Sequence, residues 1–386
     1  MRAGAIVFLR NLLIAVSGFI LVSKGVKNLS EADTAFLLLV MLVINAQNAL
    51  YEGLFLVHTM SFKDKCARTI LKRQNKIQVL IPVLAIIFVL IYSNIVLDIS
   101  IGYGYVALLY FCFYGNILSI SVVNVFCSIR GFTWCFILDI VFTTAFIILS
   151  VTYSSRIILI LALLLRVGGS AFAGLIFQVR YKKSNDKKLL SLPLYSMGYF
   201  SGTLLSLFRD TLSPLLIGWF VGPSILIAIR IFNTCYSAPG LFASALNKII
   251  VRYARKKQSA KKVFITYLIG LYVLSIGYLL IWYIGGERLY LLLFGKTQYF
   301  PQTVFLYSIS LFCLFWPLGQ TAITGMIFTG SSRLFFIVSI IWTFASAICI
   351  FILFIYGIEF YMLAIAFSQM LNILIVYLVR KNETII

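Results

Sequence analysis

The stretch SLFRDTLSPLLIGW, Ser206–Trp219, places Arg209 and Asp210 side by side inside a long apolar run. A charge at the centre of a lipid bilayer costs about 2.5–3.5 kcal/mol on insertion scales. If this run crosses a membrane, the two adjacent charges indicate either a structural ion pair or a polar site within the bilayer.

The composition of the whole chain is that of a membrane protein. Of its 386 residues, 62% are hydrophobic and only 11% are charged, whereas soluble domains carry roughly 25% charged residues. So few charges cannot cover a soluble surface. The net charge of +21 is therefore explained by membrane topology, and we expect no nucleic-acid partner. The cysteines are scattered and His58 is the single histidine, so we expect no metal site and no cofactor.

The apolar runs predict an all-α polytopic protein, because a membrane-spanning helix needs about 20 apolar residues. Reading between polar breaks gives about twelve spans. They cover residues 3–22, 34–56, 77–97, 104–127, 132–151, 157–178, 190–219, 223–248, 263–284, 301–326, 334–356 and 360–379. Pro193 and Pro214 lie near the ends of the seventh span, so we expect a tilt or a kink there.

The basic residues predict the orientation, because cytoplasmic loops of membrane proteins carry an excess of Lys and Arg. With the N-terminus inside and alternating spans, most of the 32 basic residues fall on the inner side. The outer loops hold only Lys24, Lys27, Arg156, Arg288 and Lys296. We therefore expect both termini to be cytoplasmic.

The loops also indicate an internal repeat of six spans. Long basic inner loops follow the second and eighth spans, at 58–76 and 252–262. We predict an N-terminal six-helix bundle over 1–181, a basic cytoplasmic linker over 182–188 and a C-terminal six-helix bundle over 189–386. Parallel repeats of this kind place a substrate site at their interface.

Charged residues within the predicted spans are the candidate site residues. Arg166, Arg209 and Arg230 lie deep in spans, and we predict that they bind an anionic substrate, since the guanidinium fork fits phosphate. The candidate coupling or ion-pair residues are Asp139, Asp210 and Glu52. Arg10 and Glu52 lie near span ends, where a side chain can reach the headgroups.

Two readings of Arg209 stay open. It pairs with Asp139 or Asp210 and fixes packing, or it faces a water-filled cationic cavity. We expect Arg209 and Asp210 to point in different directions, because neighbours on an α-helix diverge by about 100°.

Small residues mark two further features of the spans. In RVGGSAFAG, Arg166–Gly174, the pairs Gly169/Ala173 and Ser170/Gly174 predict close helix contact. In WPLGQTAITG, Trp316–Gly325, Pro317 and Gly319 predict a weakened helix. Broken helices at membrane depth normally line cavities.

These residues resemble a known family. The stretch DTLSPLLIGWFVGPSILIAIRI, Asp210–Ile231, contains an Asp, an apolar run, a Gly, a Val-Gly and then an Ala and a basic residue. This order resembles the pattern of Wzx-type O-antigen and polysaccharide flippases. These belong to the multidrug/oligosaccharidyl-lipid/polysaccharide (MOP) exporter superfamily. The aromatic residue that often follows the Val-Gly is absent, since Pro223 and Ser224 stand there.

The resemblance implies two six-helix bundles around a V-shaped, cationic central cavity. It implies a bacterial inner-membrane flippase for undecaprenyl-pyrophosphate-linked oligosaccharide, coupled to a proton or sodium gradient. Polysaccharide polymerase and chain-length proteins are the expected protein partners, beside membrane lipids.

Three alternatives stay open. One is an ion-coupled drug or small-molecule exporter of the same superfamily, although the deep charges are mostly basic. A second is an integral membrane glycosyl polymerase or ligase, but the loops hold no cluster of carboxylates and histidines, so we do not expect an enzyme. A third, a major-facilitator transporter, lacks its expected Gly-x-x-x-Asp-Arg-x-Gly-Arg loop within 53–76.

Overall fold

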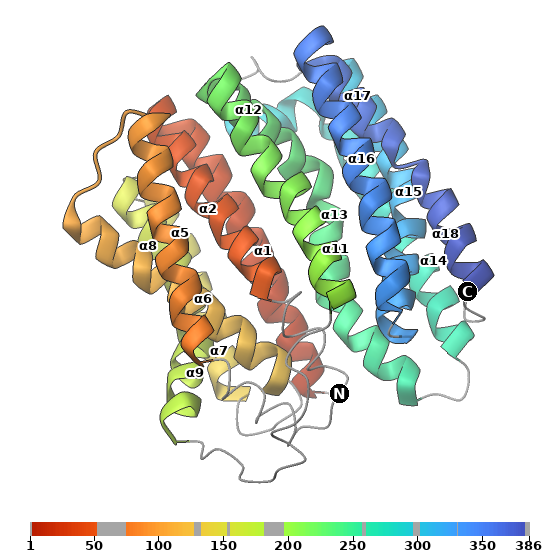
Figure 1. The fold of residues 1–386 in the computed structure, drawn as a ribbon, viewed down its shortest axis with the longest axis horizontal. Helices are drawn as coiled ribbons and strands as arrows, with labels where there is room; N and C mark the ends of the chain where they lie inside the picture. Colours follow the sequence, from red (N-terminus) through yellow and green to blue (C-terminus); the bar gives the residue numbers. More distant parts are fainter. Residues whose placement is uncertain are drawn as a thin grey trace. The chain divides into compact units, whose positions relative to one another are not determined.

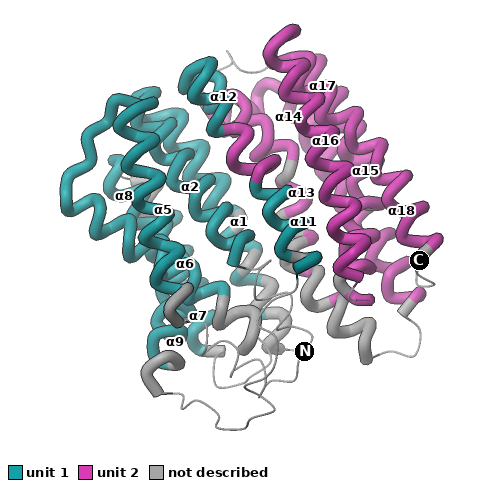
Figure 2. The backbone as a smooth tube through the Cα atoms, in the orientation of Figure 1, with its two compact units in different colours: residues 1–207, 215–227 teal, residues 208–214, 228–386 magenta. Residues whose placement is uncertain are grey.

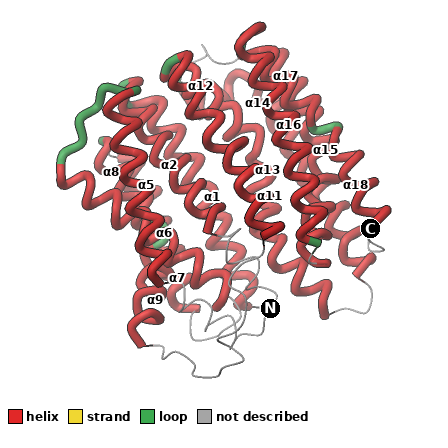
Figure 3. The backbone as a smooth tube through the Cα atoms, viewed as in Figure 1, coloured by secondary structure: helices red, strands yellow, loops and turns green. Residues whose placement is uncertain are grey.

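The computed structural model describes residues 2–51, 75–126, 133–152, 155–180, 197–256, 260–295, 302–329 and 331–382. Within these ranges the chain is helical, and no strand occurs (Figure 3). The prediction of an all-α polytopic membrane protein is therefore confirmed.

Figure 1 shows the helices in chain order. The first group is α1 (Arg2–Asn28), α2 (Glu31–Tyr51), α5 (Asn75–Ile95), α6 (Tyr103–Phe126), α7 (Thr133–Thr152), α8 (Arg156–Leu165), α9 (Gly168–Arg180) and α11 (Met197–Leu207). A π-helical turn, η3 (Phe208–Leu212), precedes α12 (Ser213–Val221) and α13 (Pro223–Lys256). The last group is α14 (Ala260–Phe294), α15 (Gln302–Thr329), α16 (Ser332–Tyr356), α17 (Ile358–Ser368) and α18 (Leu371–Asn382).

Each predicted span overlaps one of these helices or a run of two or three consecutive elements. By length and composition, eight helical stretches of the described residues are apolar enough to cross a membrane, or nine if α8 and α9 form one broken span. The predicted count of twelve is compatible with this arrangement and stays a prediction. The predicted end of the ninth span at 284 lies close to Gly286, where α14 bends at non-helical backbone angles.

The chain forms two compact units, coloured in Figure 2. Unit 1 comprises residues 1–207 and 215–227, and unit 2 comprises residues 208–214 and 228–386. The predicted bundles over 1–181 and 189–386, and the V-shaped cavity between them, stay predictions. The predicted linker, 182–188, lies outside the described residues.

Unit 1 is held together by close helix contacts at small residues. A Cβ at Gly169 of α9 would lie 2.5 Å from the carbonyl oxygen of Cys135 in α7, and one at Gly174 would lie 2.9 Å from Leu118 Cβ in α6. Only glycine permits these distances. The prediction of close contact from the small-residue pairs is confirmed at both glycines.

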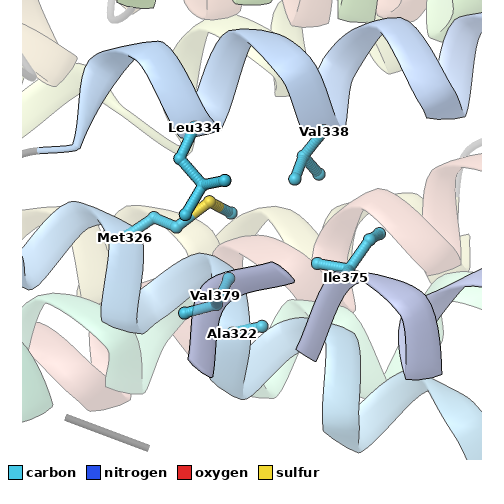
Figure 4. Packing of buried hydrophobic residues seen from close by; sticks show 6 residues of the cluster. All are labelled: Ala322, Met326, Leu334, Val338, Ile375 and Val379. Atoms are coloured by element: carbon cyan, nitrogen blue, oxygen red, sulfur yellow. The ribbon is translucent and has the colours of Figure 1, made fainter. Parts of the chain in front are cut away.

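Unit 2 is organised around α15, which packs against α14, α16, α17 and α18. Figure 4 shows one of its apolar clusters, in which Leu334 and Val338 of α16 face side chains from α15 and α18. The cluster members are Ala322, Met326, Leu334, Val338, Ile375 and Val379.

The predicted weakness at Pro317 and Gly319 differs from the structure, because α15 runs through both residues. Gly319 serves close packing instead. A Cβ there would lie 2.0 Å from Asn372 Oδ1 of α18, so the absent side chain lets α18 approach.

Candidate functional site

Charged side chains lie within apolar helices of both units. In unit 1, Arg10 of α1 and Asp139 of α7 form an ion pair, with Arg10 Nε 2.6 Å from Asp139 Oδ2. The side chains are 6% and 0% exposed. A buried pair of this kind needs further hydrogen bonds to offset the desolvation of its charges.

Two serines supply those hydrogen bonds. Arg10 Nη2 donates to Ser119 Oγ at 2.7 Å and to Ser170 Oγ at 3.0 Å, and the two hydroxyls lie 2.6 Å apart. The backbone N–H of Ser170 donates to Asp139 Oδ1 at 2.9 Å. Both carboxylate oxygens of Asp139 therefore have a partner.

The break in the sixth span explains why the Ser170 N–H is available. Arg166 and Val167 separate α8 from α9, and the two helices meet at an angle of 51°. Ser170 lies in the first turn of α9, whose N–H groups have no partner within the helix. Asp139 thus caps α9, and its negative charge is favourable at a helix N-terminus.

The position of Arg10 differs from the expectation that it reaches the headgroups, because only 5% of the residue is exposed. The sequence placed Asp139 among the ion-pair candidates but offered Arg209 as its partner. The actual partner, Arg10, lies on α1, which packs along α7. Ser119 carried no signal, since single serines are common in membrane helices, and Ser170 was identified only as a small residue at a helix contact.

Arg166 lies at the break between α8 and α9 and is buried within unit 1, with 8% of the residue exposed. Thr143 Oγ1 of α7 donates to its backbone oxygen at 3.2 Å. Its Nε atom is buried without a hydrogen-bond partner. Among the described residues, its guanidinium has neither an ion pair nor a hydrogen bond.

In unit 2, Arg209 and Asp210 pair with each other. Arg209 Nε lies 2.5 Å from Asp210 Oδ1, and Nη2 lies 2.7 Å from Oδ2. The side chains are 25% and 58% exposed, unlike the enclosed pair of unit 1. The structure therefore shows Arg209 paired with Asp210, one of the two alternatives for Arg209. The expectation that the two side chains point in different directions is wrong.

The pair lies on an irregular stretch of backbone. Residues 208–212 form a π-helical turn, which is wider than an α-helical turn. Pro214 follows, and its ring supplies no N–H and clashes with the carbonyl of a preceding α-helical turn. Ser213 Oγ donates to the Phe208 carbonyl at 2.9 Å. The π-helical turn before Pro214 contains Arg209 and Asp210. The tilt or kink expected in this span stays a prediction, and Pro193 lies outside the described residues.

Polar and aromatic side chains of unit 2 surround this pair. The guanidinium carbon of Arg209 lies 5.9 Å from the centre of the Trp342 ring on α16, a cation–π distance. Tyr361 of α17 lies near Asp210 and is hydrogen-bonded to Asn233 of α13. Tyr361 thus joins α17 to α13 through Asn233.

Arg230 lies on α13 one turn before Asn233, so the two share a helix face. It is half-buried, and its Nε atom has no hydrogen-bond partner. No described residue forms an ion pair with it. Of the three predicted substrate cations, Arg209 and Arg230 thus belong to unit 2 and Arg166 to unit 1. Glu52 lies outside the described residues.

Sequence comparisons identify no relative, since no family model and no curated protein matches the chain. Solved structures do resemble it. A MOP superfamily transporter from Pyrococcus furiosus, described as having a binding pocket of reverse polarity, has a TM-score of 0.63 at 12% identity, covering 98% of this chain and 95% of that chain.

Two further structures are similar. The lipid II flippase MurJ, in an inward closed conformation, has a TM-score of 0.64 at 14% identity, covering 96% of this chain and 86% of that chain. A multidrug resistance MATE family transporter, inward-facing, has a TM-score of 0.57 at 14% identity, covering 97% and 94%. The chain is therefore a multi-pass membrane protein with the fold of MOP superfamily transporters.

Proposed function

We propose that the chain is a flippase for undecaprenyl-pyrophosphate-linked oligosaccharide repeat units. It moves the repeat unit of O-antigen or another surface polysaccharide from the cytoplasmic to the periplasmic leaflet by alternating access. The observation that carries the proposal is the pair of unit 2 cations, Arg209 and Arg230, on apolar helices. Arg230 has no counter-ion among the described residues, and an unpaired cation within a membrane protein favours an anionic ligand.

Arg209 and Asp210 form an exchangeable pair. Asp210 accepts from two nitrogens of Arg209, which is the geometry in which the guanidinium fork also holds phosphate. The carboxylate is 58% exposed, so a phosphate can replace it at low cost. Asp210 then occupies the fork in the absence of substrate, and a pyrophosphate displaces it.

Asp210 is also the better candidate for coupling to a proton or sodium gradient. Asp139 is fully buried and has both oxygens engaged, by Arg10 and by the N–H of Ser170. Asp210 is exposed, and displacement from Arg209 would free it to bind a cation. We therefore assign coupling to Asp210 and a structural role to Asp139.

The expected setting is the bacterial inner membrane, with both termini cytoplasmic. There a polysaccharide polymerase and its chain-length proteins would receive the translocated repeat units.

The test has two arms. A null strain should lose surface polysaccharide and accumulate a single lipid-linked repeat unit in the cytoplasmic leaflet. In proteoliposomes, the purified protein should move a fluorescent undecaprenyl-pyrophosphate oligosaccharide between leaflets. Arg209→Ala and Arg230→Ala should each lose most of this activity, whereas Arg288→Ala, at an exposed arginine of α14, should keep it.

Normal surface polysaccharide together with altered drug sensitivity in the null strain would overturn the proposal. It would favour an ion-coupled drug exporter, the other activity compatible with the MATE-like fold.

A further inference from the structure

The interior of unit 1 contains more positive than negative charge. Arg10 and Asp139 neutralise each other in a satisfied network with Ser119 and Ser170. Arg166 adds a second guanidinium that is 8% exposed and has a buried Nε without a partner. The described part of this interior therefore carries one uncompensated positive charge.

The other described acidic side chains of unit 1 do not supply the missing negative charge. Asp33 accepts from Arg156 at the start of α8, and Glu31 accepts from Ser224. Asp98 is exposed in the connection between α5 and α6. A buried, unpaired cation is costly in a medium of low dielectric constant, so the position beside Arg166 favours an anion.

The surroundings of Arg166 limit the size of that anion. Arg166 lies among α1, α6 and α7, with Cys112 and Arg10 in electrostatic range. Gly18 of α1 has no side chain, and a Cβ built there would lie 3.7 Å from Arg166 Nη1. The absent side chain leaves room of about one methyl group beside the guanidinium. This suits a small monovalent ion better than a phosphate group.

We propose that Arg166 holds a small monovalent anion of the halide class, such as chloride, inside unit 1. The ion neutralises the second guanidinium and stabilises the break between α8 and α9. Arg166 belongs to unit 1, whereas Arg209 and Arg230 belong to unit 2. The halide site is tested by protein stability and not by transport. The result of that test is therefore independent of the flippase proposal.

Thermal unfolding of the full-length protein in detergent tests the site. The protein is exchanged into sodium gluconate and titrated with sodium chloride, sodium bromide or sodium sulfate at constant ionic strength. The unfolding temperature of the wild type should rise with chloride and bromide and then saturate, as binding to the folded state requires. Sulfate stabilises folded proteins by exclusion from their surface, so it should raise the unfolding temperature of the wild type and of Arg166→Gln equally and without saturating. The Arg288→Gln control should respond as the wild type does.

The decisive variant is Arg166→Gln, which removes the charge and keeps a polar side chain. In gluconate it should unfold at the same or a higher temperature than the wild type, because it buries no unpaired charge. Halide should not raise its unfolding temperature. A chloride response in Arg166→Gln equal to that of the wild type would overturn the proposal, as would a saturating sulfate response of the wild type that Arg166→Gln lacks.

A second arm tests whether a carboxylate of the protein is the missing partner. Glu52 was predicted as an ion-pair residue and lies outside the described residues. If it pairs with Arg166, the variants Arg166→Gln and Glu52→Gln should each be destabilised in gluconate and in chloride alike. The double variant should then regain stability, and this result would also overturn the halide site. A halide response retained in Glu52→Gln supports it.

Discussion

Arg10 Nε lies 2.6 Å from Asp139 Oδ2, and the second oxygen of the same carboxylate, Oδ1, accepts the backbone N–H of Ser170 at 2.9 Å. Asp139 therefore joins three helices of unit 1: α1 through Arg10, its own α7, and the N-terminus of α9. Removal of this carboxylate affects an ion pair and a helix cap together.

The first prediction concerns this ion pair. Asp139→Asn keeps an oxygen for the Ser170 N–H but removes the negative charge that balances the buried guanidinium of Arg10. Removal of one partner of a buried pair costs about 3–5 kcal/mol. We expect a large fall in unfolding temperature and in membrane protein level, measured in purified protein and in membranes.

The double variant Arg10→Met/Asp139→Asn is the control. It removes both charges, so its unfolding temperature should exceed that of Asp139→Asn alone, because neighbouring substitutions are not additive. If the double variant is destabilised by the sum of the two single effects, the residues do not act as a pair.

The second prediction concerns Arg209. Because its ion pair with Asp210 is partly exposed, Arg209→Ala should change stability by about 1 kcal/mol or less. Transport should nevertheless fall strongly. Arg209→Lys keeps the charge without the planar fork, so it should retain part of the activity. The measurement is substrate movement in proteoliposomes, normalised to protein level.

Asp210→Asn separates coupling from substrate binding. If Asp210 couples transport to an ion gradient, this variant should still exchange substrate between leaflets at equilibrium but should no longer accumulate it with a proton or sodium gradient. Gradient-driven accumulation at the wild-type rate would remove Asp210 from the coupling mechanism.

The third prediction concerns glycine packing. Gly169→Ala places a methyl group 2.5 Å from the Cys135 carbonyl oxygen, so α7 and α9 must separate. Overpacking of this kind costs about 1–3 kcal/mol, and the break near Arg166 should be disturbed. Gly270→Ala is the matched control, because a Cβ there meets no atom within 4 Å. Since alanine is the better helix former by about 1 kcal/mol, its unfolding temperature should stay equal or rise.

The fourth prediction concerns topology. In a cysteine-free background, Lys65→Cys and Lys257→Cys should be labelled only from the cytoplasmic side, and Arg288→Cys only from the outside. The reason is the charge asymmetry of the loops. Labelling of position 257 in intact cells by an impermeant reagent would exclude the twelve-span topology.

The sequence by itself determined where the helical elements lie, but not their ends: α14 continues to Phe294, whereas the ninth span was predicted to end at 284. Apolar runs report local hydropathy, and each predicted span overlaps a helix or a run of two or three consecutive elements. The same local information predicted the close approach at Gly169, because a residue without a Cβ lets a neighbouring helix come near.

Only the tertiary structure decided the pairing of the charges. Arg10 and Asp139 are separated by 129 positions in the chain, and their contact depends on the packing of α1 along α7. The Arg209–Asp210 pair lies on a π-helical turn, which the apolar pattern of the sequence does not reveal. Burial of a charge is a property of the packed helices. The sequence therefore grouped Arg166, Arg209 and Arg230 together. The structure places Arg166 in unit 1 and the other two in unit 2.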